Sequence, residues 1–223
     1  MTDNHDTPGA LRLPLVLLLS ALTAWLGFTV LGLGPAPGDI VKLVGTNLDA
    51  SGVSNPVTAV LLNFRGYDTL LEMAVLLLAL IGVWSLGETP LRWEAAEGTV
   101  LMHLPRLLVP VLTMAAGYLL WNGAHAPGGA FQAGSVLGAA GVLLLLSSGD
   151  LAARIMGLPL RVLLVTGLGL FVIAGLGMLT GGNQFLEYPL PLAASMILII
   201  EATATLSIAA TLAALFLGGR PGG

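Results

Sequence analysis

Six long apolar stretches constrain the fold of this chain more than any other feature of its sequence. An α-helix needs about 20 apolar residues to cross the hydrocarbon core of a bilayer. Stretches of about that length occupy residues 13–33, 56–86, 100–121, 131–148, 160–179 and 192–217. Because lipid offers no hydrogen bonds to the backbone, each stretch is predicted to be helical. The sequence therefore predicts an all-α integral membrane protein with about six transmembrane helices.

The composition supports this class and narrows the possible functions. The chain is 56% hydrophobic and 9% charged, whereas about a quarter of the residues in a soluble domain are charged. It has no cysteine, and its three histidines lie far apart without the spacing of metal ligands. No basic stripe is present to neutralise phosphates, so nucleic acid is not expected as a partner. No nucleophile motif or paired-histidine site is present either, so no independent enzyme, cofactor or metal site is predicted.

Lysine and arginine residues predict the orientation, because they accumulate in cytoplasmic segments. With the N-terminus in the cytoplasm, the outer segments 34–55, 122–130 and 180–191 carry Lys42 alone. The inner segments carry Arg12, Arg92, Arg106, Arg154, Arg161 and Arg220. Both termini are therefore predicted to be cytoplasmic. The first stretch is expected to remain as a helix, since its apolar run is about twice that of a signal peptide.

A charged patch, "NFRGYDTLLE" at residues 63–72, interrupts the second apolar stretch. Arg65, Asp68 and Glu72 follow i, i+3, i+7 spacing, which places them on one helix face. In a helix that begins at Pro56, the two carboxylates lie about 18–24 Å along its axis, near the middle of the bilayer. Arg65 and Asp68 are predicted to pair, which leaves Glu72 able to hold and release a proton or a cation. The alternative is an ion pair that pins this helix to a neighbour.

Two residues beside these charges bear on the shape of the same helix. Gly66 can loosen the helix locally, and Asn63 can satisfy a backbone group that becomes free. Such a broken helix would line a water-filled cavity. Close packing of an unbroken helix against a neighbour explains the same residues, and the sequence leaves both interpretations open.

Glu201 is a second carboxylate within an apolar stretch, in "SMILIIEATATLS". Its own stretch has no basic partner, and the small residues that follow suit close contact with another helix. The sequence leaves two interpretations open. Glu201 belongs to an ion path, or it is a protonated side chain that makes a hydrogen bond between helices.

A glycine-rich loop, "NGAHAPGGAFQAG" at residues 122–134, separates the third and fourth stretches. Pro127, Gly128 and Gly129 predict a sharp turn. Gln132 is expected to project from the first turn of the next helix, and His125 carries an imidazole suited to proton exchange near neutral pH. The loop is thus either a site that handles ions or a tight turn between helices.

This loop resembles the "GHxxPGGGFQGG" signature of the MnhB subunit of the Mrp (Mnh) multisubunit cation/proton antiporters. The matching residues are His125, Pro127, Gly128, Gly129, Phe131, Gln132 and Gly134, while alanines replace three of the glycines. The stretch "IIEATATLS" around Glu201 is similar to the final helix of that domain, where an acidic residue recurs.

The region from Pro56 resembles a different part of the same complexes, the "NxxxxDFRxxDTLxE" element. That element occurs in the E-like domains of membrane-bound hydrogenases and at the C-terminal end of the large MnhA subunit of the antiporters. The matching residues are Arg65, Asp68, Thr69, Leu70 and Glu72, and Asn63 stands where the family often has aspartate. The resemblance divides the chain into residues 1–55 with the first helix, an E-like segment at 56–99 with one transmembrane helix, and an MnhB-like domain at 100–223 with four.

The resemblance implies a small membrane subunit of a Na⁺/H⁺ antiporter complex in a bacterial or archaeal cytoplasmic membrane. Its partners would be other membrane subunits, including large antiporter-like ones, and the lipid bilayer. Na⁺ or H⁺ would be transported ions rather than cofactors. Its carboxylates would contribute to an ion path or to a subunit interface. The alternatives are an accessory subunit of a related hydrogenase, respiratory or inorganic-carbon uptake complex, and a purely structural scaffold.

Overall fold

The computed structural model describes residues 9–34, 39–87, 99–147 and 157–218, and every regular element in these ranges is helical. Six helices are long and apolar enough to cross a membrane. They span Leu13–Gly32, Gly66–Ser85, His103–Asn122, Ala130–Ser147, Leu158–Thr180 and Leu190–Leu217. The predicted all-α class and the six membrane helices are thus confirmed. Three of the arginines predicted to be cytoplasmic, Arg92, Arg154 and Arg220, lie outside the described residues.

The chain divides into two compact units, residues 1–42 and 43–223. The first unit contains α1 (Gly9–Gly32), whose apolar part is the first candidate membrane helix. Helix α2 (Ile40–Asn47) crosses the boundary between the units, and the 3-10 helix η1 (Leu48–Ser51) follows it. The second unit carries the remaining five candidate membrane helices and both of the motifs that the sequence singles out.

The second apolar stretch is broken rather than continuous. It begins with the short helix α3 (Pro56–Ala59), continues as the π-helix η2 (Val60–Phe64), and is interrupted at Arg65, where φ is −130° and ψ is 37°. Helix α4 (Gly66–Ser85) follows and is the part that can cross a membrane. At 1.5 Å per residue, Glu72 lies only about 9 Å from the start of α4. The second stretch is therefore not one continuous helix from Pro56, and the depth of Glu72 in a membrane stays a prediction.

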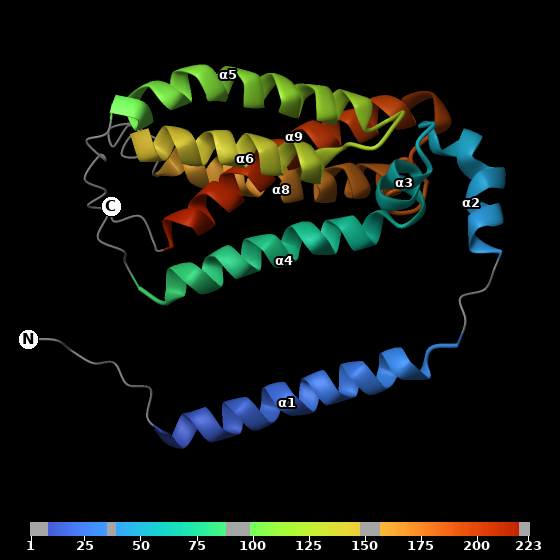
Figure 1. The fold of residues 1–223 in the computed structure, drawn as a ribbon. Helices are drawn as coiled ribbons and strands as arrows, with labels where there is room; N and C mark the ends of the chain where they lie inside the picture. The colour runs from blue at the N-terminus through green and yellow to red at the C-terminus, as the bar shows by residue number, and fades with distance from the viewer. Residues whose placement is uncertain (1–8, 35–38, 88–98, 148–156, 219–223) are drawn as a thin grey trace, which may run out of the picture. The chain divides into compact units, whose positions relative to one another are not determined.

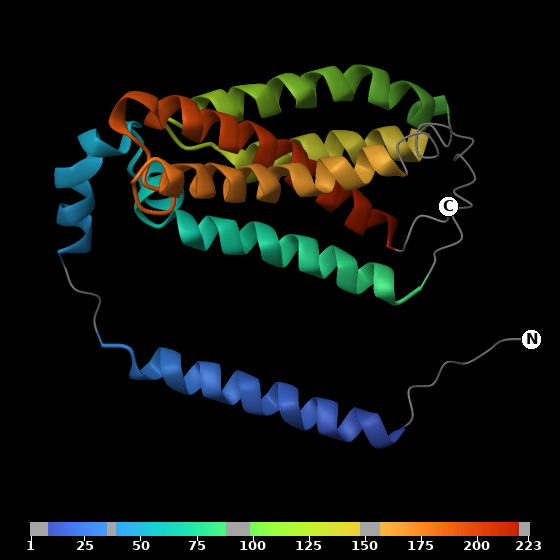
Figure 2. The same ribbon diagram turned by 180° about the vertical axis from the view of Figure 1, so that it is seen from behind.

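The other helices of the second unit surround α9 (Leu190–Leu217), which runs obliquely among them in Figures 1 and 2. Its neighbours are α4, α5 (Thr99–Asn122), α6 (Ala130–Ser147) and α8 (Leu158–Thr180). Glycines permit the close approach that membrane helices favour. A Cβ added at Gly134 of α6 would lie 2.8 Å from Ile208, and one added at Gly167 of α8 would lie 2.7 Å from the Cβ of Ser207.

The connections at one end of the second unit pack into a common core. This core contains residues from the segment before α3, from α3 and η2, and from the turn between α8 and α9. Its buried members include Val53, Leu62, Phe171, Leu186 and Ile197. The turn between α5 and α6 lies at the same end (Figure 1). The opposite end holds the last turns of α4, α6 and α9 and the first turns of α5 and α8 (Figure 1).

Candidate functional site

Glu201 is the buried carboxylate of the second unit, with a relative exposure of 3%. It projects from α9 toward the first residue of α6, and its carboxylate accepts a hydrogen bond from the backbone N–H of Ala130. The first N–H groups of a helix have no partner within the helix, and they carry partial positive charge. The other carboxylate oxygen, Oε2, is buried and has no hydrogen-bond partner among the described residues. Glu201 therefore caps α6 with one oxygen and retains one free oxygen.

The glycine-rich loop is shaped to admit this carboxylate. Gly129 precedes α6 with a φ of +103°, and a Cβ added there would lie 2.8 Å from Glu201 Oε1. Its N–H donates to the carbonyl of Leu119 at 2.9 Å, which closes the turn against the end of α5. A Cβ at Gly128 would clash with that same carbonyl. The structure thus joins two features that the sequence presented separately, the PGG turn and Glu201.

His125 and Gln132 are the polar side chains of the same loop region, and both are exposed. The backbone N–H of His125 donates to the carbonyl of Asn122 at 2.9 Å, which makes part of the turn. Gln132 projects from the first turn of α6, as predicted, and its Oε1 lies 3.8 Å from a Cβ built on Gly129. Gln132 therefore lies on the Glu201 side of the turn, while no described contact connects the His125 imidazole with the carboxylate.

The charged patch lies on the surface of the second unit. Arg65 and Asp68 form the predicted ion pair, with side chains that are 69% and 43% exposed. Glu72, one helical turn further on, is also exposed. Thr69 and Met73 are the buried residues of this part of α4, so Glu72 projects away from the core. Within this chain, Glu72 at the surface and the buried Glu201 do not share a site.

The helix break combines elements of both interpretations that the sequence left open, while the water-filled cavity stays a prediction. Thr69 Oγ1 donates to the carbonyl of Leu61 at 2.6 Å, a group that the break leaves without a regular helical partner. Asn63 Nδ2 donates to the carbonyl of Ser51 at 3.0 Å and so ties η2 to the preceding segment. Gly66 is buried, and a Cβ added there would lie 3.3 Å from the Leu186 side chain. The helix is broken, and Gly66 also provides close packing.

Asn55 is a functional residue that the sequence reasoning missed. Its Oδ1 accepts from the N–H of Val57 at 3.0 Å and caps α3, and its Nδ2 donates to the carbonyls of Gly123 at 3.0 Å and Ala126 at 2.8 Å. Thr58 Oγ1 also donates to the Gly123 carbonyl, at 2.5 Å. These bonds fasten the segment before α4 to the glycine-rich loop. The one available signal was asparagine directly before proline, a helix N-cap pattern.

Tyr188, beside the same end of the bundle, precedes α9 and is buried. Burial raises the pKa of its phenol above the ordinary value, so the hydroxyl stays protonated. Its oxygen has no hydrogen-bond partner among the described residues. The ring contributes to the apolar core that holds the connections together.

Five apolar helices packed around a capped, buried carboxylate define the second unit as a multi-pass helical membrane domain. The chain belongs to the family of domains related to the MnhB subunit of Na⁺/H⁺ antiporters, whose profile matches residues 100–219. The matched range includes the glycine-rich loop, α6, α8, α9 and nearly all of α5. The predicted resemblance to the MnhB subunit is confirmed.

The N-terminal part of the chain resembles a segment of the large MnhA subunit of the antiporters, as predicted. The relative is the A-type subunit of the Na⁺/H⁺ antiporter of Bacillus subtilis (strain 168), which is 38% identical over 50 residues. This match covers 22% of the chain and 6% of that protein's length.

Two solved structures are similar in fold. One is a chain of the Mrp complex from Dietzia sp. DQ12-45-1b, with a TM-score of 0.67 and 24% identity over 98% of this chain and 27% of that one. The other belongs to the membrane-bound sulfane sulfur reductase, an archaeal respiratory membrane complex. It has a TM-score of 0.63 and 26% identity over 92% of this chain and 96% of that one.

The domain boundaries predicted at residues 56 and 100 stay a prediction.

Proposed function

We propose that the chain is a membrane subunit of an Mrp-type Na⁺/H⁺ antiporter in a bacterial or archaeal cytoplasmic membrane, with both termini in the cytoplasm. The family match over residues 100–219 and the fold shared with a chain of an Mrp complex support this assignment. The Lys/Arg distribution supports the orientation. Its partners are other membrane subunits, including large antiporter-like ones.

Glu201 carries the proposed role in ion movement. A buried carboxylate must be neutral or must have a partner, because burial of an isolated charge is costly. The N-terminus of α6 supplies partial positive charge at one oxygen, while Oε2 remains free to hold a proton or to contact a cation. This arrangement stabilises both states of the carboxylate and allows exchange between them. His125, exposed at the same end of the bundle, is positioned to exchange protons with water.

The charged patch of α4 has a different proposed role, at the boundary with a neighbouring subunit. Arg65, Asp68 and Glu72 are exposed or half-exposed near the start of a membrane helix, where lipid cannot satisfy them. The patch holds two carboxylates and one cation, so a partner that offers a positive or hydrogen-donating group complements it. Glu72 then adds a carboxylate where the proposed ion path crosses between subunits.

A second candidate is an accessory subunit of a related respiratory complex. The present chain matches 96% of the length of the similar chain in the sulfane sulfur reductase, so the two chains share nearly their whole architecture. In such a complex the driving reaction takes place in other subunits, and this chain retains the same membrane role.

Affinity purification of the tagged chain in mild detergent, with mass spectrometry of every co-purifying subunit, distinguishes the two complexes. Redox subunits among the partners would favour the respiratory assignment. The purified complex is then reconstituted, and Na⁺-dependent proton movement is measured per assembled complex. Glu201→Gln keeps the size of the side chain and an acceptor for Ala130, and we expect it to reduce that movement at least tenfold.

The matched control is Glu187→Gln, which removes an exposed carboxylate outside the membrane helices while keeping an acceptor for the N–H of Gln184. It is expected to retain full transport. Normal transport by assembled Glu201→Gln complex would instead support the scaffold function, in which the carboxylate only connects α9 with α6.

A further inference from the structure

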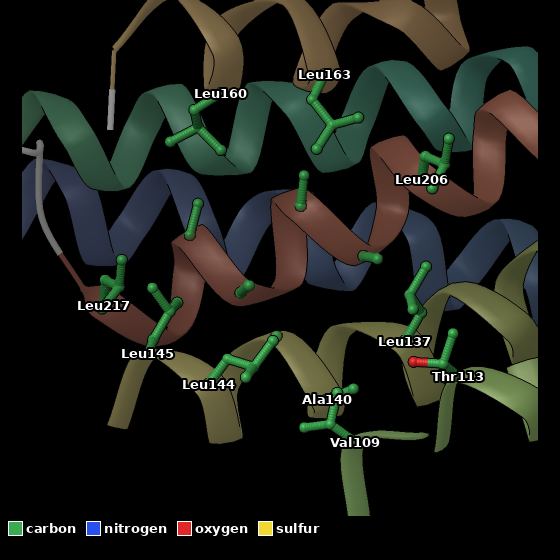
Figure 3. Close-up of a pocket in the computed structure, with 15 residues that line it drawn as sticks. Val109, Thr113, Leu137, Ala140, Leu144, Leu145, Leu160, Leu163, Leu206 and Leu217 are labelled. Carbon is green, nitrogen blue, oxygen red and sulfur yellow. The ribbon is translucent and has the colours of Figure 1, made fainter. Parts of the chain in front are cut away.

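An apolar cavity of about 230 Å³ lies along α9 in the second unit. Figure 3 shows α8 residues Leu160 and Leu163 on one side of α9, and residues of α6 and α5 on the other. Leu217 and Leu145 mark one end of the cavity, while Thr113 and Leu206 mark the other. Thr113 is the only hydroxyl-bearing residue of the lining.

Small side chains keep this space open. Four alanines of α9, at positions 209, 210, 213 and 214, contribute to the lining together with Ala140 of α6. Protein interiors otherwise contain few voids larger than one water molecule. Apolar cavities stay dry, because water finds no hydrogen-bond partners in them. The cavity therefore suits an apolar occupant rather than water.

The size of the cavity indicates that its occupant is an unbranched hydrocarbon chain rather than a helix of a partner protein. A cavity of about 150 Å³ accommodates benzene, so the same proportion gives about nine carbon atoms for this one. A single α-helical turn has about 14 backbone heavy atoms before any side chain is added. The space of about 230 Å³ is thus too small for a partner helix, whereas part of an acyl chain fits.

A positive charge lies at one end of the cavity. Arg106 of α5 precedes the lining residues Val109 and Thr113 by three and seven residues, which places all three on one helix face. Arg106 is exposed and lies one turn beyond the lining, toward the end of the bundle where α9 terminates (Figure 1). Arg161, in the first turn of α8, lies at the same end but lines a separate pocket on another face of α8. Arginine side chains extend readily to the headgroup region of a bilayer.

We propose that this cavity binds an acyl chain of an anionic phospholipid whose phosphate lies beside Arg106. Basic residues at cytoplasmic ends of helix bundles attract anionic headgroups. The apolar lining holds the chain, and Arg106 selects the headgroup. The site is separate from Glu201 and does not depend on the transported ion.

The test uses the complex that co-purifies with the tagged chain, reconstituted in phosphatidylcholine nanodiscs. A small amount of phosphatidylglycerol with a diazirine in one acyl chain is added, and labelled peptides are mapped after photolysis. We expect label on the lining residues of α5, α6 and α8. Thr113→Phe fills the cavity and should reduce labelling of the α8 wall at least fivefold. Met114→Phe is the control, because Met114 is 76% exposed and is not part of the lining.

The headgroup is tested by competition between unlabelled phosphatidylglycerol and phosphatidylcholine. Wild type and Arg106→Lys should prefer phosphatidylglycerol at least threefold, and Arg106→Gln should lose the preference while acyl labelling persists. All variants are first checked for the wild-type set of co-purifying subunits. If Thr113→Phe does not assemble, Ala213→Leu fills the same space from α9. Labelling of the lining that neither filled variant reduces would overturn the proposal. So would a lack of headgroup preference in wild type, or cross-linking of a photoreactive residue at position 113 to another subunit instead of lipid.

Discussion

Replacing Gly129 by alanine tests whether the PGG turn exists to seat the Glu201 carboxylate. The substitution has two separate effects. An L-residue at a φ of +103° is strained, which costs about 1–3 kcal/mol. The new Cβ would also lie 2.8 Å from Glu201 Oε1, so the carboxylate must leave the N–H of Ala130. Loss of a hydrogen bond to a charged group costs about 1.5–3 kcal/mol more.

Gly182→Ala isolates the first effect. Gly182 has a φ of +83°, and nothing lies within 4 Å of a Cβ built there, so only backbone strain is introduced. A change of 1 kcal/mol shifts the thermal midpoint of a chain of this size by about 2–4 °C. Gly129→Ala should therefore lower the temperature at which the chain is lost from the complex by about 3–12 °C more than Gly182→Ala does.

A double-mutant cycle assigns the difference to the carboxylate. In a Glu201→Ala background the obstructing oxygen is absent, so Gly129→Ala should cost only about as much as Gly182→Ala. The readout is the thermal midpoint of the purified complex, measured as retention of the chain after heating. Equal losses from Gly129→Ala with and without the carboxylate would show that Gly129 serves backbone geometry alone, and the proposed seat for Glu201 would be refuted.

Three further perturbations test the membrane topology, the hydrogen bonds of Asn55 to the glycine-rich loop, and the proposed subunit interface around Arg65 and Asp68. A cysteine at Gly182 should react with an impermeant thiol reagent from outside the cell and one at Leu86 should not, since both positions are exposed at opposite ends of the second unit; the reverse pattern would invert the topology. Asn55→Ala should destabilise the chain by about 2–4 kcal/mol in the same heating assay, because it removes an N-cap and two donations to the loop, whereas Asn55→Ser should retain the cap and lose less. Asp68→Asn should reduce the yield of assembled complex, because it leaves Arg65 without its partner at the proposed interface; an unchanged yield would contradict that interface.

Features that depend on local spacing were predictable from the sequence. Lipid imposes helix on any stretch of about 20 apolar residues, so all six membrane helices could be located. The Arg65–Asp68 pair spans three residues, which helix geometry brings together without help from the rest of the fold. The sharp turn at Pro127–Gly129 has a local cause as well, and it was predicted.

Features that depend on contacts between helices were not predictable. The break at Arg65 is supported by Asn63 bonding to Ser51 and by Thr69 bonding to Leu61. The first of these bonds exists only when the segment before α3 folds back on η2. Without these contacts the sequence left a broken helix and close helix packing as open alternatives. Similarly, no periodic pattern indicates that α9 meets α6 at the height where Glu201 reaches Ala130.

The separation of Glu201 from Glu72 constrains how a complex can use them. Glu201 has a seat within its own chain, since α6 supplies a donor and the surrounding helices exclude solvent. In the proposed role, exchange of protons or cations at Glu201 would depend on what reaches the free Oε2, and not on a charged partner nearby. Glu72 has no such seat, because it projects from the exposed side of α4. At the proposed interface, a neighbouring subunit would complete its environment, since lipid cannot solvate a charge there. A continuous ion path through both carboxylates therefore requires polar groups from outside this chain between them. Dissociation of the neighbour that covers α4 should then impair exchange at Glu72 while leaving the Glu201 seat intact.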